Sequence, residues 1–199
     1  SENYANVVAG NTGIALNTIP GARPIEVYSS IIAQQTFEAL GHLPAPYTRF
    51  EQLLIASITK AVAKAGIDAA SPRTGFVVST TKGNIDMLHQ GAYPSIDPKR
   101  VYLANSAKAV VGHFNNPNTP IVISNACISG VLAIIMAARL LRSGQYDYVI
   151  ACGGDIINDF TASGFQSFKA LSDAPCKPFD TNRTGLNLGE AFGTMVLTA

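Results

Sequence analysis

The sequence has few charges, few cysteines and no long hydrophobic run. Charged residues occupy 14% of the 199 positions, and 14 Lys and Arg stand against 13 Asp and Glu. This balance argues against an electrostatic nucleic-acid binder, which usually carries a basic surplus. No stretch reaches the ~18 uninterrupted apolar residues of a membrane span, and no signal peptide pattern follows Ser1. We therefore expect a soluble, cytoplasmic protein that binds neither nucleic acid nor membrane.

The three cysteines are widely spaced and odd in number, which argues against a disulfide framework. No CxxC or HxxxH pair offers the spacing of a metal site, so we expect no metal. The length is enough for one sizeable domain with a full core. Hydrophobic residues make up 47% of the chain. Because so much apolar character accompanies so little charge, we expect a partner or further chain to cover part of the surface.

Hydrophobic periodicity predicts strands that alternate with helices, which is typical of a layered α/β fold with a mainly parallel sheet. The Ile128–Ser143 helix is apolar nearly all round and is expected to be central and buried. A long polar excursion covers Ser172–Glu190, and the chain opens with a helix and turn over Ser1–Ile14. The other expected helices are Phe50–Gly66 and Val101–Phe114, and the expected strands are Thr74–Thr80, Ile121–Ser124, Tyr146–Gly154 and Ala191–Thr198.

Cys127 stands between an expected strand and the apolar helix, in "SNACISG" (Ser124–Gly130). A sharp turn at such a junction exposes a side chain, and the helix N-terminus offers a positive partial charge and unpaired N–H groups. Both favour a thiolate, and the N–H groups can hold an oxyanion. The small neighbours Ala126, Ser129 and Gly130 are expected to leave room for a substrate chain. Free cysteine is also often buried and inert, so position alone leaves both interpretations open.

The other two cysteines are not expected to take part in chemistry. Cys152 lies inside an expected strand and is interpreted as a core residue. Cys176 lies in a polar loop beside prolines and is interpreted as incidental.

Two blocks of the sequence carry a family resemblance. The first is "SNACISG" followed by the apolar helix. The second is "GFQSFKALSDAPCKPFDTNRTGLNLGEAFGTMVLT" (Gly164–Thr198), with its Gly-Phe, "ALS", "PFD", "R-G", "GE" and closing strand. Together they resemble the β-ketoacyl synthases, the condensing enzymes of fatty acid and polyketide synthesis. "CGGDI" (Cys152–Ile156) and "ENYANVVAGNTGI" (Glu2–Ile14) resemble two further segments of that family, so the resemblance covers nearly the whole chain.

The sequence departs from the family pattern at three places. "STTKGNID" (Ser79–Asp86) stands where the family often has a Gly-rich stretch, and Asn125 stands where Thr or Ser is usual. Phe192 lies in "GEAFG", where "GEGAG" is common. These changes leave the chemistry plausible and the subfamily open.

The family pairs its cysteine with two histidines and a lysine of its C-terminal half, and His42, His89 and His113 match none of those motifs. We therefore interpret residues 1–199 as an N-terminal β-ketoacyl synthase domain that lacks the first strand and the C-terminal half. The resemblance implies a thiolase-like fold, layered α/β/α with a mainly parallel mixed sheet, as one half of a five-layer homodimeric protein. The second half is expected to cover an apolar face of the first.

The resemblance implies a decarboxylative Claisen condensation without a cofactor. Cys127 takes an acyl group from acyl carrier protein, and malonyl carrier protein supplies the attacking carbanion. Phe165 matches a position beside the acyl pocket, and Lys169 matches a basic position that faces the acidic carrier protein. A core aromatic and a solvated helix charge are the alternatives for these two residues. Three charged residues are expected to hold a turn and hairpin by charge-assisted hydrogen bonds: Asp180, Arg183 and Glu190.

Three other interpretations compete with this one. A thiolase would act on coenzyme A thioesters with the same fold, but "PFDTNRTGLNLGE" argues against it. A catalytically silent partner subunit that shapes chain length typically lacks the nucleophile, whereas Cys127 is present. A plain α/β domain without a site does not explain the two specific blocks. The acyl length and the pathway stay open, and residues 1–199 alone are expected to be inactive.

Overall fold

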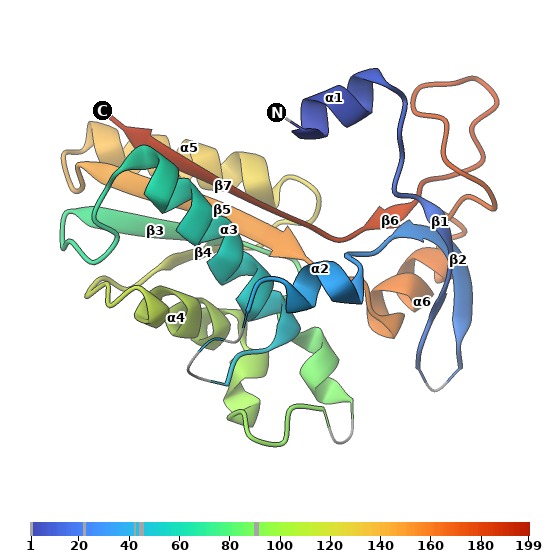
Figure 1. The fold of residues 1–199 in the computed structure, drawn as a ribbon, viewed down its shortest axis with the longest axis horizontal. Helices are drawn as coiled ribbons and strands as arrows, with labels where there is room; N and C mark the ends of the chain where they lie inside the picture. Colours follow the sequence, from blue (N-terminus) through green and yellow to red (C-terminus); the bar gives the residue numbers. More distant parts are fainter. Residues whose placement is uncertain (1, 22, 42, 44–45, 90–91) are drawn as a thin grey trace. The chain divides into compact units, whose positions relative to one another are not determined.

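The computed structural model describes residues 2–21, 23–41, 43, 46–89 and 92–199. The chain divides into two compact units. The larger unit comprises residues 34–155 and 191–199, and the smaller one comprises residues 1–33 and 156–190. Each unit is described by itself below, with the element labels of Figure 1.

A four-stranded sheet forms the centre of the larger unit. Its strands follow the order β4 (Ile121–Ile123), β3 (Thr74–Ser79), β5 (Tyr148–Asp155) and β7 (Ala191–Thr198). β3 runs parallel to β4 and β5, whereas β7 is antiparallel to β5. Every residue of β3 is buried, as expected for a parallel strand between two others. The expected mainly parallel, mixed sheet is confirmed.

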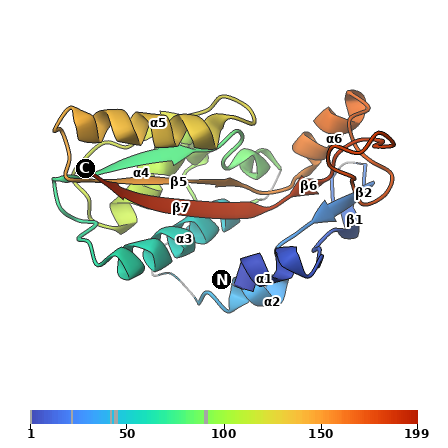
Figure 2. The same cartoon turned by 90° about the horizontal axis from the view of Figure 1, so that it is seen from above.

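Helices cover both faces of this sheet (Figure 2). α3 (Arg49–Ala65) packs on one face against β5 and β7, beside α4 (Leu103–His113). α5 (Ser129–Arg142) packs on the other face against β3, β4 and β5. A short helix, α2 (Gln34–Glu38), and two 3-10 turns, η1 (Ile85–Leu88) and η2 (Pro98–Val101), complete the larger unit. The expected α/β/α layering is confirmed.

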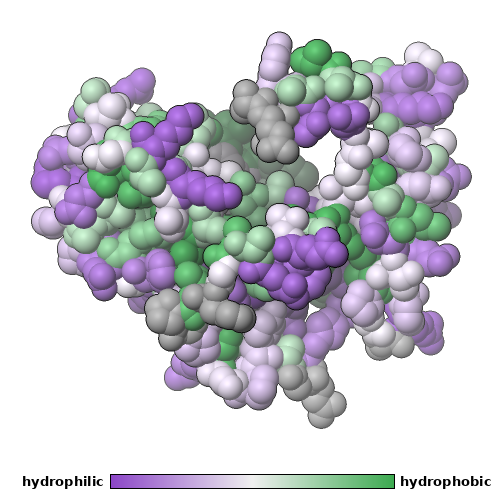
Figure 3. All heavy atoms as spheres, viewed as in Figure 1, coloured by the Kyte–Doolittle hydropathy of each residue, from purple (hydrophilic) through white to green (hydrophobic). Residues whose placement is uncertain are grey.

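The boundaries of α3 follow from its sequence. Thr48 and Glu51 form a capping box, in which the Thr48 hydroxyl accepts from the Glu51 N–H and the Glu51 carboxylate accepts from the Thr48 N–H. The helix ends at Gly66, which has a φ of 65° and therefore adopts the left-handed conformation that glycine accommodates. Within the helix, Leu54 and Ile58 are fully buried. Figure 3 shows polar and apolar side chains mixed over α3, with apolar side chains along the neighbouring β7.

α5 is buried along one side only, although its sequence is apolar nearly all round. One side packs into the core through small and branched residues, while the opposite side exposes a stripe of large apolar residues. The exposed fractions are 52% for Ile128, 60% for Val131, 37% for Ile134 and 41% for Ile135. These residues recur at intervals of three and four, which places them along one side of the helix. The expectation that this helix is central and buried is therefore wrong for the described chain. That the second half of the protein covers an apolar face stays a prediction.

The smaller unit is built on a hairpin of β1 (Ala15–Ile19) and β2 (Ile25–Ser30). The two-residue β6 (Leu188–Gly189) pairs parallel with β2. α6 (Asp159–Ser167) packs against the hairpin, and Ile19, Val27 and Ala162 form the buried core. The unit also contains α1 (Glu2–Val8), where a helix is expected. Across the described residues of both units, no helix is long and apolar enough to cross a membrane.

Candidate active site

Cys127 lies where β4 runs into α5, at the carboxyl end of the parallel strands. β4 ends at Ile123, whose carbonyl accepts a hydrogen bond from the Thr80 N–H at 3.2 Å, and this bond ties the ends of β3 and β4 together. α5 begins at Ser129, so residues 124–128 alone connect the strand to the helix. The Cys127 side chain is exposed in this connection. The structure therefore places the thiol at the expected junction and open to solvent.

The turn that presents Cys127 is strained. Ala126 has a φ of 45°, in the left-handed region that residues with a Cβ rarely adopt. The Ile128 N–H donates to the Asn125 carbonyl at 3.3 Å, which closes the chain into a tight turn. Such a conformation persists only where the surrounding structure holds it.

Ser129 holds this turn from the helix side. Its Oγ accepts from the Asn125 N–H at 2.8 Å and donates to the Ala126 carbonyl at 2.7 Å. Ser129 is buried, with 5% of its surface exposed. The Ser129 hydroxyl is thus bonded to the backbone of the turn, and the expectation that this small neighbour leaves room for a substrate chain stays a prediction. Ala126 and Gly130 are exposed, in keeping with an open side at Cys127.

The loop after β3 is fixed at the same edge of the sheet. The Asp155 carboxylate, at the end of β5, accepts from the Thr80 hydroxyl at 2.7 Å and from the backbone N–H groups of Thr81 and Lys82 at 3.1 Å. This loop belongs to the stretch that departs from the family's Gly-rich pattern. A carboxylate thus anchors the stretch, and hydrogen bonds join the ends of β3, β4 and β5 at the edge of the sheet where the Cys127 turn lies.

The other two cysteines occupy different environments. Cys152 is 2% exposed in β5, and burial raises the pKa of its thiol to about 12. Its interpretation as a core residue is confirmed. Cys176 is half-buried in the polar excursion, where its N–H donates to the Asn187 side-chain oxygen at 2.7 Å. Of the three thiols, only that of Cys127 is exposed.

Phe165 and Lys169 both belong to the smaller unit. Phe165 lies on α6 and is half-buried, and its carbonyl accepts from the Ala170 N–H at 3.1 Å. Lys169 is exposed just beyond the helix, with a φ of 54° that turns the chain sharply. It follows Phe168, which is 83% exposed. The structure thus brings these two residues together on one segment, and their roles toward substrate and carrier stay predictions.

The charged residues of the polar excursion bond to backbone, as expected. The Glu190 carboxylate accepts from the N–H groups of Ile32 at 2.9 Å and Ile157 at 3.3 Å. The Arg183 guanidinium donates to the Asp180 carbonyl at 2.8 Å. The expected turn is confirmed, since the Asp180 carboxylate also accepts from the Asn182 N–H at 2.7 Å, whereas the expected hairpin is wrong, because residues 172–190 form none.

Two of the three histidines, His89 and His113, lie in the part of the larger unit that the structure describes. His113 is half-buried in the last turn of α4, with its ring edge-on to Phe114 at 5.1 Å and to Tyr47 at 5.6 Å between centroids. Burial lowers the pKa of His113. His89 is exposed, and His42 lies outside the described residues. In the part of the chain that the structure describes, no three His, Cys, Asp or Glu side chains cluster as a metal site.

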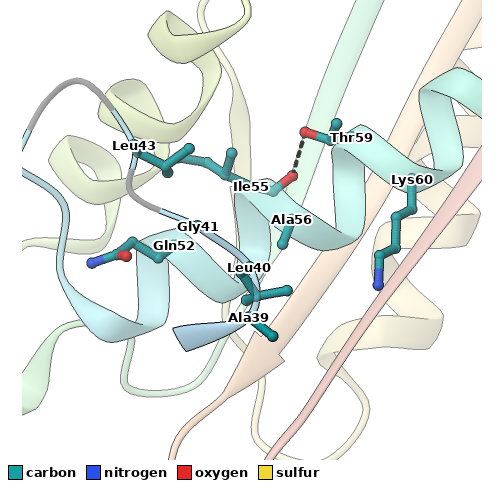
Figure 4. A pocket seen from close by; sticks show the side chains of 9 residues that line it. All are labelled: Ala39, Leu40, Gly41, Leu43, Gln52, Ile55, Ala56, Thr59 and Lys60. Atoms are coloured by element: carbon teal, nitrogen blue, oxygen red, sulfur yellow. Dashed lines mark hydrogen bonds between the residues drawn. The ribbon is translucent and has the colours of Figure 1, made fainter. Parts of the chain in front are cut away.

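A separate hollow of about 290 Å³ opens beside α3 (Figure 4). Leu40 and Leu43, from the segment between α2 and α3, face Ile55 of α3 across this hollow. The Thr59 hydroxyl is already bonded to the Ile55 carbonyl at 2.9 Å, and Lys60 contributes a charged side chain to the described lining. α3 and α5 cover opposite faces of the sheet, so this hollow does not belong to the Cys127 turn.

Comparison with known proteins agrees with this geometry. The family model "Beta-ketoacyl synthase, N-terminal domain" matches residues 35–199. The chain is 27% identical to the tetracenomycin polyketide synthase ketoacyl synthase alpha subunit of Streptomyces glaucescens, covering 96% of this chain and 52% of that protein. It is 29% identical to 3-oxoacyl-(acyl-carrier-protein) synthase 2 of Vibrio cholerae, covering 74% of this chain and 41% of that protein.

The fold is also that of solved ketosynthases. The whole chain superposes on 54% of the structure of the ishigamide ketosynthase/chain length factor, with a TM-score of 0.81 and 24% sequence identity. The expected thiolase-like fold is thereby confirmed. The chain spans about half the length, or less, of the relatives named here. With the family model matching most of its residues, the chain belongs to the β-ketoacyl synthase family.

Proposed function

We propose that Cys127 is the nucleophile of a decarboxylative condensation in fatty acid or polyketide synthesis. The observation that carries this proposal is the exposed thiol at the strained β4–α5 turn of a β-ketoacyl synthase domain. Exposure separates Cys127 from Cys152, whose thiol is buried. The adjacent helix N-terminus offers a positive partial charge and unpaired N–H groups to the negatively charged intermediate of the reaction.

In the proposed reaction, the Cys127 thiolate attacks the carbonyl carbon of an acyl thioester on acyl carrier protein. A carbon–sulfur bond forms, the carbonyl oxygen becomes an oxyanion, and collapse of this intermediate expels the carrier's thiolate. The backbone N–H of Cys127 donates to the oxyanion. Malonyl carrier protein then loses CO2, and the resulting carbanion attacks the acyl carbonyl. A carbon–carbon bond forms, and the thiolate of Cys127 leaves.

Phe165 and Lys169 are proposed as substrate-side residues on the smaller unit. Phe165 would border the acyl pocket, and Lys169 would face the acidic carrier protein. The exposure of Lys169 and of the adjacent Phe168 supports a contact that combines a cation with an apolar side chain. We expect the complete protein to act as a homodimer with its carrier protein.

The test measures how fast the full-length protein forms the condensation product from acyl and malonyl carrier proteins. Cys127→Ala should lower the rate by at least about 1,000-fold, because the covalent step has no substitute nucleophile. Cys176→Ala is the matched control and should retain activity, since its thiol is half-buried in the polar excursion. Retained condensation by Cys127→Ala would refute the proposal.

Carrier docking is tested separately. Lys169→Glu should raise the KM for the acyl carrier protein, most clearly at low salt, and leave the alkylation rate of Cys127 unchanged. Lys177→Glu, also exposed in the smaller unit, is the matched control for a general charge effect. An unchanged KM in Lys169→Glu would show that Lys169 does not belong to the docking surface.

The proposal also predicts that residues 1–199 alone do not condense or decarboxylate. The chain supplies a nucleophile and one oxyanion donor, and its histidines match none of the family's catalytic motifs. Loss of members of one catalytic unit is strongly non-additive, so the remainder should be nearly inactive. The comparison is CO2 release from malonyl carrier protein by residues 1–199 and by the full-length protein. Comparable rates would show that a base within these residues promotes the decarboxylation. His113→Ala would then be the first variant to test.

A further inference from the structure

We propose that Ser129 is a positioning residue that orients the backbone N–H of Cys127 toward the reaction oxyanion. This inference rests on the proposed function, in which that N–H stabilises the charge formed when a thioester is attacked. It assigns Ser129 a part in the reaction through the peptide group that it holds, without contact with the substrate.

The first step of the argument is the peptide bond between Ala126 and Cys127. Its carbonyl oxygen accepts from the Ser129 hydroxyl at 2.7 Å and from the Ser129 N–H at 3.3 Å. The described chain contains no cis peptide bond, so this peptide is trans and planar. In a trans peptide the carbonyl and the N–H point in opposite directions. Fixing the Ala126 carbonyl therefore fixes the direction of the Cys127 N–H.

The second step is that one oxygen atom holds both sides of the turn. The Ser129 hydroxyl also accepts from the Asn125 N–H at 2.8 Å, on the strand side of Ala126. A hydroxyl can donate and accept at once, which neither alanine nor a purely accepting side chain can do. The turn between these two bonds contains the left-handed φ of 45° at Ala126, a conformation that needs such support.

The third step is that Ser129 itself is held firmly in place. Ser129 is the first residue of α5 and is 5% exposed. The helix is anchored on the sheet through the buried Ala133 and Ala137. A donor that is already oriented before the charge appears stabilises the transition state without reorganisation. The arrangement from sheet to helix to Ser129 gives the Cys127 N–H this property.

The experiment compares two reactions of Cys127 in the full-length protein. Acylation by short-chain acyl thioesters of N-acetylcysteamine passes through an oxyanion, whereas alkylation by iodoacetamide displaces iodide at a saturated carbon and forms none. Ser129→Ala should slow acylation by about 10- to 100-fold, less than full removal of an oxyanion donor because the 3.3 Å backbone bond remains. Alkylation should stay near the rate of the unaltered protein.

Two further variants sharpen the comparison. Ser129→Thr keeps the hydroxyl and should recover most of the acylation rate. Ser143→Ala removes the hydroxyl at the other end of α5, where it bonds to the Leu140 carbonyl, and should leave both rates unchanged. If Ser129→Ala folds poorly, Ala126→Gly combined with it restores the turn, since glycine adopts a positive φ without strain. That double variant should still acylate slowly.

Each outcome has a defined meaning. Equal loss of acylation and alkylation in Ser129→Ala, or normal acylation in either Ser129→Ala or the double variant, overturns the positioning role alone. If the unaltered protein alkylates at Cys127 but never forms an acyl adduct there, the proposed function itself fails. Slow acylation with normal alkylation, restored by Ser129→Thr, supports the inference.

Discussion

Replacing Glu51 by alanine should destabilise the larger unit more than most single substitutions. Glu51 is fully buried at the start of α3. Its carboxylate accepts from the Thr48 N–H at 3.0 Å, the Asn84 amide at 2.8 Å and the Ser106 hydroxyl at 3.1 Å, and it forms an ion pair with Arg100. One side chain therefore joins α3, α4 and the 3-10 turns.

The magnitude follows from what each partner loses. Breaking a buried ion pair by removing one member costs about 3–5 kcal/mol, because the other charge is left without compensation. The Arg100 side chain is 18% exposed and can regain some hydration, which places its share near the lower end of that range. Loss of the helix cap adds about 1 kcal/mol. We expect the free energy of unfolding to fall by about 3–5 kcal/mol in total.

The assay is equilibrium urea unfolding of the full-length protein, followed by circular dichroism. Asp147→Ala is the matched control, because it breaks the ion pair with Arg73 at 2.6 Å on the exposed surface, where such pairs contribute little. The Glu51→Ala midpoint should fall well below that of the control. Coinciding midpoints would refute the claim that Glu51 organises this buried network.

Two further predictions concern stability. Burial lowers the pKa of His113, so the contribution of its neutral side chain to stability is present above its ordinary pKa of 6.5 and is lost as the pH falls below that value. Between pH 7.5 and pH 5, the melting temperature of His113→Phe should therefore fall less than that of the unaltered protein. Equal falls in the two melting temperatures would contradict this. A Cβ at Gly153 would lie 2.3 Å from a backbone oxygen of β3, so Gly153→Ala should cost at least about 1–3 kcal/mol. Gly112→Ala, with nothing within 4 Å of its Cβ, should be neutral or stabilising, and equal melting temperatures for the two variants would contradict the crowding at Gly153.

The sequence predicts the larger unit well because its elements are long and apolar. The β-branched run of β3 and the amphipathic repeat of α3 each give a signal over many residues, and both elements lie within a residue of their expected bounds. The hairpin β1–β2 and helix α6 were not predicted. β1 has five residues and is mostly exposed, and α6 has nine residues that include Gly164. Short elements that bury little apolar surface leave weak periodicity, and packing within the unit decides their structure.

The candidate site was predictable in place but not in detail. The strand-to-helix junction marks Cys127 as a candidate, and the family resemblance of the surrounding residues favours the nucleophile over a buried, inert thiol. The hydrogen bonds from Ser129 to the turn were not predictable, since nothing in the sequence indicates that Ala126 adopts a positive φ. The Thr48–Glu51 pair does carry a capping-box signature, which could have located the start of α3.

One departure from the family pattern is explained by packing. Phe192, which stands in place of a small residue, places its ring 5.6 Å from that of Phe50, which is 1% exposed. The larger side chain therefore contributes to the packing between β7 and α3. Sequence alone marks the departure, and only the three-dimensional neighbour shows its effect.

The central claim, that Cys127 is the reactive nucleophile, is tested most directly by limited alkylation. The full-length protein is treated near neutral pH with less than one equivalent of iodoacetamide, and the labelled peptides are identified by mass spectrometry. Cys127 should be modified ahead of Cys176 and far ahead of Cys152, because it is exposed at a helix N-terminus while Cys152 is buried with a pKa of about 12. Modification of Cys176 first, with Cys127 untouched, would contradict the account.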